Sequence, residues 1–208
     1  MLIQPNAIQP DEIVAGCIAI YRNIWSDPEK TIQTIKDVTN NPTSGIFFEK
    51  ALTIKDVKQG KTSSQKRTNF DLPLLECAQK NEEFRKINNR FFETIFSATK
   101  AYQELMDIEE EAHFVEGFNL LRYEGGQEYT AHYDGSTSSG RSISPILYLN
   151  DDYKGGELEF VNFNLKIKPE AGTLYLFPAN YAYRHIAHPI TNGTKYAIVT
   201  WLHDRPAG

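Results

Sequence analysis

The spacing of apolar residues predicts helices in the first half of the chain. Between residues 82 and 106, apolar side chains recur every three or four positions, which is the strongest helical signal in the sequence. A second helix is predicted after residues 26–29, Ser-Asp-Pro-Glu, because a cap residue before proline is typical of a helix start. Asn40-Asn41-Pro42 ends that helix. Residues 18–25 and 46–57 have instead the pattern of extended chain.

The second half of the chain has a different pattern. After residue 113, short runs rich in β-branched and aromatic residues alternate with Gly, Asn, Asp and Pro. The predicted strands cover residues 114–123, 129–133, 143–149, 158–160, 173–177 and 196–202. Such spacing is typical of β-sandwiches and barrels. We therefore predict an α+β fold with a mainly β core, in which N-terminal helices pack on an antiparallel jelly roll.

Composition favours a single soluble domain over residues 1–208. The chain carries 22 Lys and Arg against 27 Asp and Glu, a net charge of −5, and 40% of its residues are hydrophobic. This acidic balance argues against a nucleic-acid partner, and no apolar run is long enough to span a membrane. Residues 1–10 lack the pattern of a secretory signal, and Cys17 and Cys77 lack disulfide or zinc spacing. We therefore expect a cytoplasmic protein with reduced thiols.

One segment, residues 55–71, fits neither pattern. It is rich in Lys, Gln, Gly, Ser, Thr and Arg and has few apolar anchors, so its composition predicts a mobile loop. Its basic residues include Lys55, Lys58, Lys61, Lys66 and Arg67. The loop is either a lid that closes over a bound polypeptide or a solvated surface segment. Protection from limited proteolysis when a peptide is added would favour the lid.

His132-Tyr133-Asp134 is the candidate metal site. Residues two apart on a strand point to the same face, so the imidazole and the carboxylate would converge as two ligands of a facial iron(II) site. Composition alone would produce about 0.65 such pairs in this chain, so a third ligand is needed to give the pair meaning. His185 and His188 are both candidates. They are three residues apart, so only one of them can face the site from a strand.

Lys195 begins a run of otherwise apolar and aromatic residues, 195–201. Burying a lysine is costly unless an anion neutralises it. Lys195 is therefore either the partner of a bound anion or an outward-facing residue at the start of a strand, and the pattern by itself leaves both interpretations open.

Taken together, these features resemble the prolyl 4-hydroxylase branch of the iron(II)- and 2-oxoglutarate-dependent dioxygenases. Residues 118–203 carry the specific resemblance, and residues 56–68 resemble the family's mobile substrate loop more weakly. The matching segments, in order, are Leu-Leu-Arg-Tyr-Glu-Gly-Gly-Gln-Glu-Tyr at 120–129, His132-Tyr133-Asp134, Arg141, residues 145–150, residues 155–160, His185, Pro189, Gly193, Lys195 and Trp201. The resemblance implies a double-stranded β-helix over residues 114–205, with residues 1–113 as a supporting layer.

The resemblance also implies a role for each candidate residue, and it leaves His188 outside the site. The implied roles are His132, Asp134 and His185 as iron ligands, Tyr123 and Lys195 as partners of the distal carboxylate of 2-oxoglutarate, and Tyr129, Arg141 and Trp201 as substrate contacts. The implied reaction hydroxylates prolyl residues of a protein or peptide, with succinate and carbon dioxide as co-products and ascorbate as reductant.

Two alternatives are weighed against this activity. One is an oxygenase of the same chemistry that acts on a free amino acid, another side chain or a nucleic acid. Base-repair relatives would be expected to bind the cosubstrate through arginine and to have a more basic surface, unlike this chain. The other alternative is a non-catalytic jelly-roll binding module, which would be expected to have lost at least one ligand. The sequence does not indicate an oligomeric state.

Overall fold

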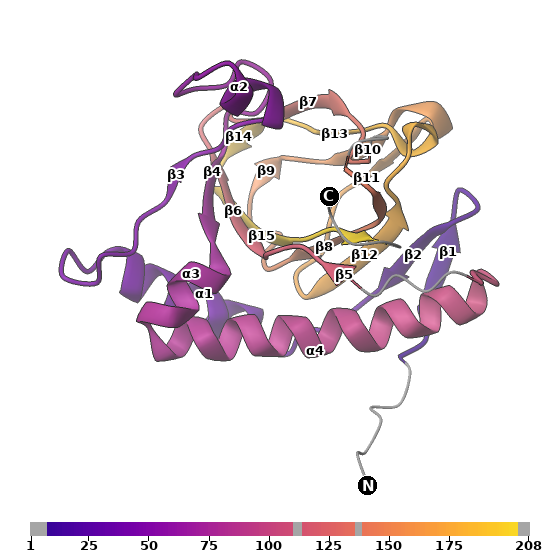
Figure 1. The fold of residues 1–208 in the computed structure, drawn as a ribbon, viewed down its shortest axis with the longest axis horizontal. Helices are drawn as coiled ribbons and strands as arrows, with labels where there is room; N and C mark the ends of the chain where they lie inside the picture. The colour runs from indigo at the N-terminus through magenta and orange to yellow at the C-terminus, as the bar shows by residue number, and fades with distance from the viewer. Residues whose placement is uncertain (1–7, 110–113, 136–138, 204–208) are drawn as a thin grey trace, which may run out of the picture.

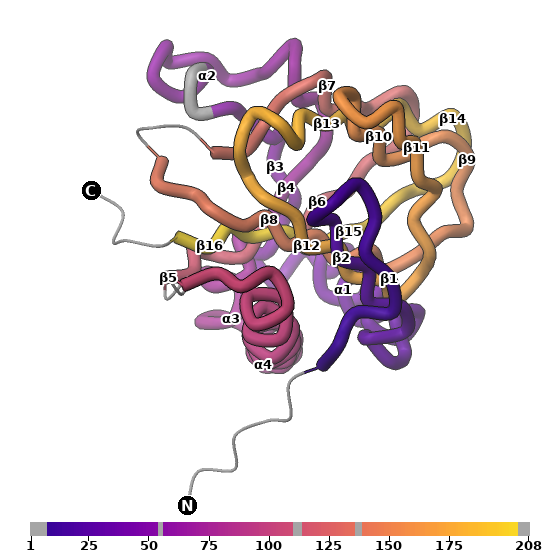
Figure 2. The backbone as a smooth tube through the Cα atoms, turned by 90° about the vertical axis from the view of Figure 1, so that its right-hand side faces the viewer, coloured from indigo at the N-terminus to yellow at the C-terminus, as the bar shows by residue number. Residues whose placement is uncertain are grey.

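A computed structural model of the chain describes residues 8–109, 114–135 and 139–203. The helices and strands are arranged in layers: the long helix α4 (Glu82–Leu105) lies beneath a large sheet, and a smaller sheet lies above it (Figures 1 and 2). The fold is thus mainly β with few helices, as predicted. No helix in the described residues is long and apolar enough to cross a membrane.

The large sheet has ten strands, in the order β1-β2-β12-β8-β15-β6-β4-β3, with β16 paired to both β8 and β5. Their bounds are β1 Glu12–Val14, β2 Ile18–Tyr21, β3 Glu49–Lys50, β4 Phe70–Pro73, β5 Phe114–Val115, β6 Asn119–Glu124, β8 Arg141–Tyr148, β12 Thr173–Pro178, β15 Thr194–Val199 and β16 Leu202–His203. Its strand pairings are antiparallel. The four strands β1 to β4 come from the first half of the chain, which therefore builds part of the sheet as well as the helices.

The smaller sheet has four strands in the order β11-β10-β13-β7, and β14 and β9 form a separate pair. Their bounds are β7 Tyr129–His132, β9 Lys154–Gly155, β10 Leu158–Phe160, β11 Leu165–Ile167, β13 His185–Ala187 and β14 Ile190–Asn192. The remaining helices are α1 Pro28–Thr39, α2 Ile54–Lys58, α3 Leu74–Lys80, and the 3-10 turns η1 Val161–Phe163 and η2 Tyr181–Tyr183.

The helical spacing in α4 and the alternation in the strands together build the core. One face of α4 is buried, including Phe84, Phe91 and Ile95, and it packs under the large sheet. In β15, Ile198 belongs to this lower core, whereas Ala197 packs on the opposite side of the sheet. Side chains along a strand alternate between its faces, so the upper face of the large sheet points toward the smaller sheet. The candidate site lies between the two sheets.

The helix predictions for the two strongest patterns are confirmed. α4 covers residues 82–105, and Asn81 caps it by accepting hydrogen bonds from the backbone N–H groups of Glu83 and Phe84. α1 begins with Pro28 and ends at Thr39, immediately before the predicted stop. The starts of both helices follow local rules. Proline suits the first turn of α1, and the asparagine side chain before α4 satisfies N–H groups that lack a partner within the helix.

Other predicted boundaries are wrong. Residues 46–57 are not one extended segment, because only Glu49–Lys50 form a strand and residues 54–58 form α2. The predicted strand 114–123 is divided into β5 and β6, and the predicted strand 196–202 into β15 and β16. The two breaks lie side by side: the N–H of Glu116 donates to the carbonyl of Trp201, and the hydroxyl of Thr200 donates to the carbonyl of Glu116. The strand predicted over 18–25 ends at Tyr21.

Candidate active site

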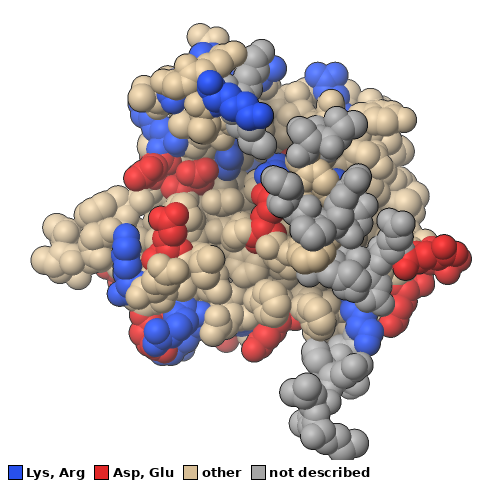
Figure 3. Space-filling view, in the orientation of Figure 1, with Lys and Arg blue, Asp and Glu red and all other residues tan. Residues whose placement is uncertain are grey.

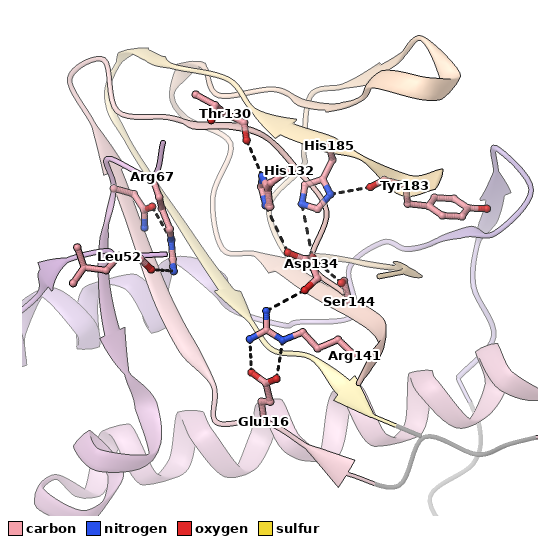
Figure 4. Close-up of polar contacts among 11 residues, drawn as sticks. Leu52, Arg67, Glu116, Thr130, His132, Asp134, Arg141, Ser144, Tyr183 and His185 are labelled. Carbon is pink, nitrogen blue, oxygen red and sulfur yellow. Dashed lines mark hydrogen bonds and ion pairs between the residues drawn. The ribbon is translucent and has the colours of Figure 1, made fainter. Parts of the chain in front are cut away.

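His132, Asp134 and His185 lie together between the two sheets. Their potential ligand atoms all lie within 4.8 Å of one another. In the described part of the chain, this is the group of His, Cys, Asp and Glu side chains that could hold a metal ion. His132 ends β7 and His185 begins β13, where they face each other as direct cross-strand partners. Nε2 of His132 is 3.6 Å from Oδ1 of Asp134, and Nε2 of His185 is 3.8 Å from its Oδ2 (Figure 4).

The side chains of the triad are oriented by hydrogen bonds. Nδ1 of His132 donates to the carbonyl of Thr130 at 2.8 Å, and Nδ1 of His185 donates to the carbonyl of Tyr183 at 3.0 Å. With Nδ1 carrying the proton, the Nε2 of each ring presents its lone pair toward Asp134. Asp134 is oriented from the other sheet, because Oγ of Ser144 on β8 donates to its Oδ2 at 2.7 Å. Figure 4 shows all three groups pointing into the same space.

The charge state of the triad suits a divalent cation. Burial, together with the proximity of His185, lowers the pKa of His132 to about 3, so its imidazole is neutral at neutral pH. Burial alone would raise the pKa of the Asp134 carboxyl, but the two histidines and the hydrogen bond from Ser144 outweigh it and lower that pKa. Two imidazoles and one carboxylate form the facial donor set that binds non-haem Fe(II), so the residues present fit this metal.

The triad forms part of the lining of a cavity with about 560 Å³ of empty space, including its open mouth. Lys195 also lines this cavity. Its side chain is 1% exposed, and its Nζ donates to the carbonyl of Gly156 at 3.1 Å and lies 4.4 Å from the ring centre of Tyr123. No carboxylate forms an ion pair with Lys195 among the described residues. The structure thus contradicts the outward-facing interpretation of Lys195 and leaves an ammonium in the cavity with two further N–H donors to satisfy.

Burial of Lys195 predicts that the stability of the metal-free protein depends on pH. Burial lowers the pKa of this ammonium from 10.5 to about 7, and the attraction of Glu157 opposes this only in part. Between these two pH values the unfolded chain binds a proton that the folded metal-free protein has released, so the free energy of unfolding should rise with pH, by up to ~1.4 kcal/mol per unit. Urea unfolding of metal-free wild type and Lys195→Met between pH about 7 and about 10 would measure this. An identical pH slope in the two proteins would refute it.

The three predicted substrate contacts have different positions. The ring of Tyr129 stacks on that of His132 with 3.4 Å between their centres, and both Tyr129 and Trp201 line the cavity. Arg141 lies outside the cavity lining. Its guanidinium donates to both carboxylate oxygens of Glu116 at 2.7 Å and to the carbonyl of Asp134 at 3.3 Å. A substrate contact by Arg141 stays a prediction, and in this structure the side chain supports the backbone beside the triad.

The cavity also contains residues that the sequence patterns did not single out as part of a site. Ser144 and Tyr148 line it from β8, four positions apart on the same strand face. Arg67 lines it from the segment predicted to be a mobile loop. This arginine is 9% exposed, its guanidinium lies 3.2 Å from Asp71, and it stands 5.5 Å from the ring centre of Tyr129. The period-two alternation along β8 could have identified Ser144 and Tyr148, but no local signal marked Arg67 as buried.

His188, the other candidate for the third ligand, lies outside the triad. It follows β13, and its Nε2 is 2.6 Å from Oε2 of Glu159. The same carboxylate is 3.4 Å from Nζ of Lys166. His188 thus contacts a carboxylate that also forms an ion pair with Lys166 on the smaller sheet.

The segment that builds this site is similar to known proteins. Residues 118–203 match the 2OG-Fe(II) oxygenase superfamily. The predicted resemblance to its prolyl 4-hydroxylase branch is confirmed by a 34% identical relative, probable prolyl 4-hydroxylase 9 of Arabidopsis thaliana, over 43% of this chain and 41% of the relative. The chain spans about half the length of the curated relatives it matches.

Solved structures of oxygenases share the fold. A prolyl hydroxylase from Trichoplax adhaerens, in complex with a hypoxia inducible factor peptide fragment, superposes with a TM-score of 0.70 at 20% identity, covering 91% of this chain and 84% of that one. The viral collagen prolyl hydroxylase vCPH of Paramecium Bursaria Chlorella virus-1, in its 2OG complex, gives a TM-score of 0.57 at 20% identity, covering 89% and 95%. The segment that matches the oxygenase superfamily is the one that carries the triad and Lys195.

Proposed function

We propose that this protein is an iron(II)- and 2-oxoglutarate-dependent dioxygenase that hydroxylates prolyl residues of a protein or peptide, with succinate and carbon dioxide as co-products. The observation that carries the proposal is the placement of the triad and of the buried ammonium of Lys195 in the lining of one cavity. A facial triad leaves coordination positions open for a chelating keto acid and for dioxygen, and a buried ammonium without a carboxylate partner suits the acid's other end.

In this proposal the protein's own residues bind, orient and exclude water. His132, Asp134 and His185 hold Fe(II), while Lys195 and the phenol of Tyr123 receive the distal carboxylate of 2-oxoglutarate. The bound metal and keto acid together supply the oxidising power for hydroxylation of a C–H bond, with ascorbate as the reductant that keeps the iron in its ferrous state. The apolar walls of the cavity, formed in part by Leu121 and Ile146, would keep water from the reacting centre.

The proposed substrate site is the mouth of the same cavity, with Tyr129 and Trp201 in its wall and Arg141 beside it. The prolyl specificity is supported by the prolyl 4-hydroxylases among the relatives and by the peptide bound to the Trichoplax enzyme. We further propose that the strands contributed to the two facing sheets by residues 114–205 form a double-stranded β-helix, within one domain that includes the supporting layer of residues 1–113.

The experiment that tests this function is mass spectrometry of proline-containing peptide libraries incubated with the protein, Fe(II), ascorbate and 2-oxoglutarate. We expect the gain of one oxygen atom on proline, together with stoichiometric succinate. Oxygen gained only on another residue type would refute the prolyl specificity and keep the oxygenase chemistry. The absence of 2-oxoglutarate turnover with the peptide library, in protein shown to bind Fe(II), would refute the enzyme assignment.

A further inference from the structure

The segment of residues 57–69, called the basic segment below, differs in charge from the rest of this acidic chain. It contains Lys58, Lys61, Lys66 and Arg67 and no Asp or Glu, whereas the whole chain has a net charge of −5. The three lysines are exposed, while Arg67 is buried. In the space-filling view, Lys and Arg side chains gather at the top of the molecule, over α2 and the loop that follows it (Figure 3).

The fold attaches the basic segment to the strand that carries the first metal-ligand candidate. The N–H of Thr130 on β7 donates to the carbonyl of Lys66 at 2.9 Å, and the N–H of Thr68 donates to the carbonyl of Glu128 at 3.0 Å. The hydroxyl of Thr68 accepts from the N–H of Glu128 at 2.8 Å. The C-terminal part of the segment, which contains Lys66 and Arg67, therefore lies beside the strand that ends at His132, and Arg67 lines the cavity.

Internal ion pairs account for only part of this positive charge. Nζ of Lys61 lies 3.5 Å from Asp56, and the guanidinium of Arg67 lies 3.2 Å from Asp71. Neither Lys58 nor Lys66 has an ion-pair partner within the described ranges.

The acidic groups around the site are largely neutralised as well. Arg141 forms an ion pair with Glu116, and Lys166 forms one with Glu159, whose carboxylate also contacts His188. Glu128 is half-buried on the neighbouring chain segment, where its backbone pairs with Thr68, and its carboxylate enters no ion pair in the described structure. Lys58 and Lys66 thus remain available to an anionic partner that reaches the mouth.

We propose that the substrate polypeptide carries acidic residues beside its target proline, and that Lys58 and Lys66 pair with those residues as the chain enters the cavity. This inference rests on the proposed function and specifies its substrate class. Two exposed ammonium groups suit a few carboxylates on an extended peptide. They are too few for a nucleic acid, whose binding depends on neutralising many phosphates.

The test compares two peptides with the same central proline, one flanked on each side by Asp and Glu and the other by Ser and Gln. Binding is measured by fluorescence anisotropy in the presence of 2-oxoglutarate and a redox-inert divalent metal, and hydroxylation by mass spectrometry with Fe(II). We expect the wild type to bind the acidic peptide about five-fold more tightly at low salt, with the preference fading as salt is added. The KM of the wild type should likewise be lower for the acidic peptide than for the peptide flanked by Ser and Gln.

Two double variants of equal charge make the test specific. Lys58→Gln/Lys66→Gln should abolish the preference, whereas Lys30→Gln/Lys80→Gln, which removes two exposed lysines from α1 and α3, should retain it. Equal binding of both peptides by the wild type, failure to bind the acidic peptide, or equal loss of preference in both variants would overturn the proposal.

A single-stranded oligonucleotide of matched charge that competed as well as the acidic peptide would also overturn the proposal, by assigning the segment to nucleic acid. The two proposals fail differently. Hydroxylation of both peptides at equal KM refutes the acidic substrate and leaves prolyl hydroxylation intact. Preferential binding of the acidic peptide without hydroxylation of any proline supports the lysine contacts and refutes prolyl hydroxylation.

Discussion

Replacing His132, Asp134 or His185 with alanine is expected to abolish Fe(II) binding and 2-oxoglutarate turnover. The three ligand atoms lie within 4.8 Å of one another, and removing one leaves two protein donors. Loss of even an outer-shell partner of a metal ligand typically costs about 10- to 100-fold, so loss of a ligand should exceed about 100-fold in turnover. Metal content after dialysis and succinate production measure the two effects separately.

His188→Ala is the matched control for this prediction. It removes a histidine from the same part of the chain, only three residues from His185, but His188 contacts Glu159 instead of the triad. We expect the His188→Ala protein to bind Fe(II) and to turn over 2-oxoglutarate normally. An inactive His188→Ala protein beside an active His185→Ala protein would show that the third ligand is assigned to the wrong histidine.

Replacing Lys195 with methionine is expected to raise the KM for 2-oxoglutarate by about 10- to 100-fold without loss of iron. A hydrogen bond to a charged group contributes about 1.5–3 kcal/mol, and each ~1.4 kcal/mol corresponds to a factor of ten. Methionine keeps an unbranched apolar side chain close to the size of the lysine stem and removes a buried charge that has no carboxylate partner among the described residues, so the variant should fold. Initial rates at varied 2-oxoglutarate and the iron content of the same preparation provide the measurement.

Two further variants separate a specific contact from a general effect of charge. Tyr123→Phe removes a neighbouring phenol in the same cavity and should raise the KM less than Lys195→Met, because the neutral donor forms a weaker hydrogen bond to a carboxylate than an ammonium does. Lys154→Met removes an exposed ammonium on β9 and should leave the KM unchanged. A normal KM in Lys195→Met would refute the assignment of Lys195 to the cosubstrate.

The sequence was a reliable guide wherever the controlling interactions are local. The helical period of residues 82–106 and the proline at the start of α1 depend on neighbours within a turn or two, and both helices lie where the sequence predicts them. Chain breaks set by distant partners were not predictable in this way. Between β5 and β6, Glu116 instead donates its N–H to the carbonyl of Trp201 and accepts a hydrogen bond from the hydroxyl of Thr200, and both partners are more than 80 positions away in the sequence.

The same distinction between local and long-range interactions applies to the candidate site. The sequence by itself determined which residue types are present at which spacing: a histidine and an aspartate two positions apart, two later histidines, and a lysine in an apolar run. Tertiary structure decided how they are used. Pairing of β13 with β7 brings His185, not His188, opposite His132, and Ser144 reaches Asp134 from the other sheet.

Register decided the orientation of Lys195, because a strand residue faces one side of its sheet or the other and a shift by one position reverses this. The pairing of β15 with β6 sets Lys195 opposite Tyr123, so its ammonium lies inside the cavity. Likewise, the composition of the basic segment predicts a solvated loop. Its backbone pairs with the strand of His132, and this pairing places Arg67 in the cavity wall. Composition and spacing determine the available chemistry, and the long-range pairing of strands determines which groups meet.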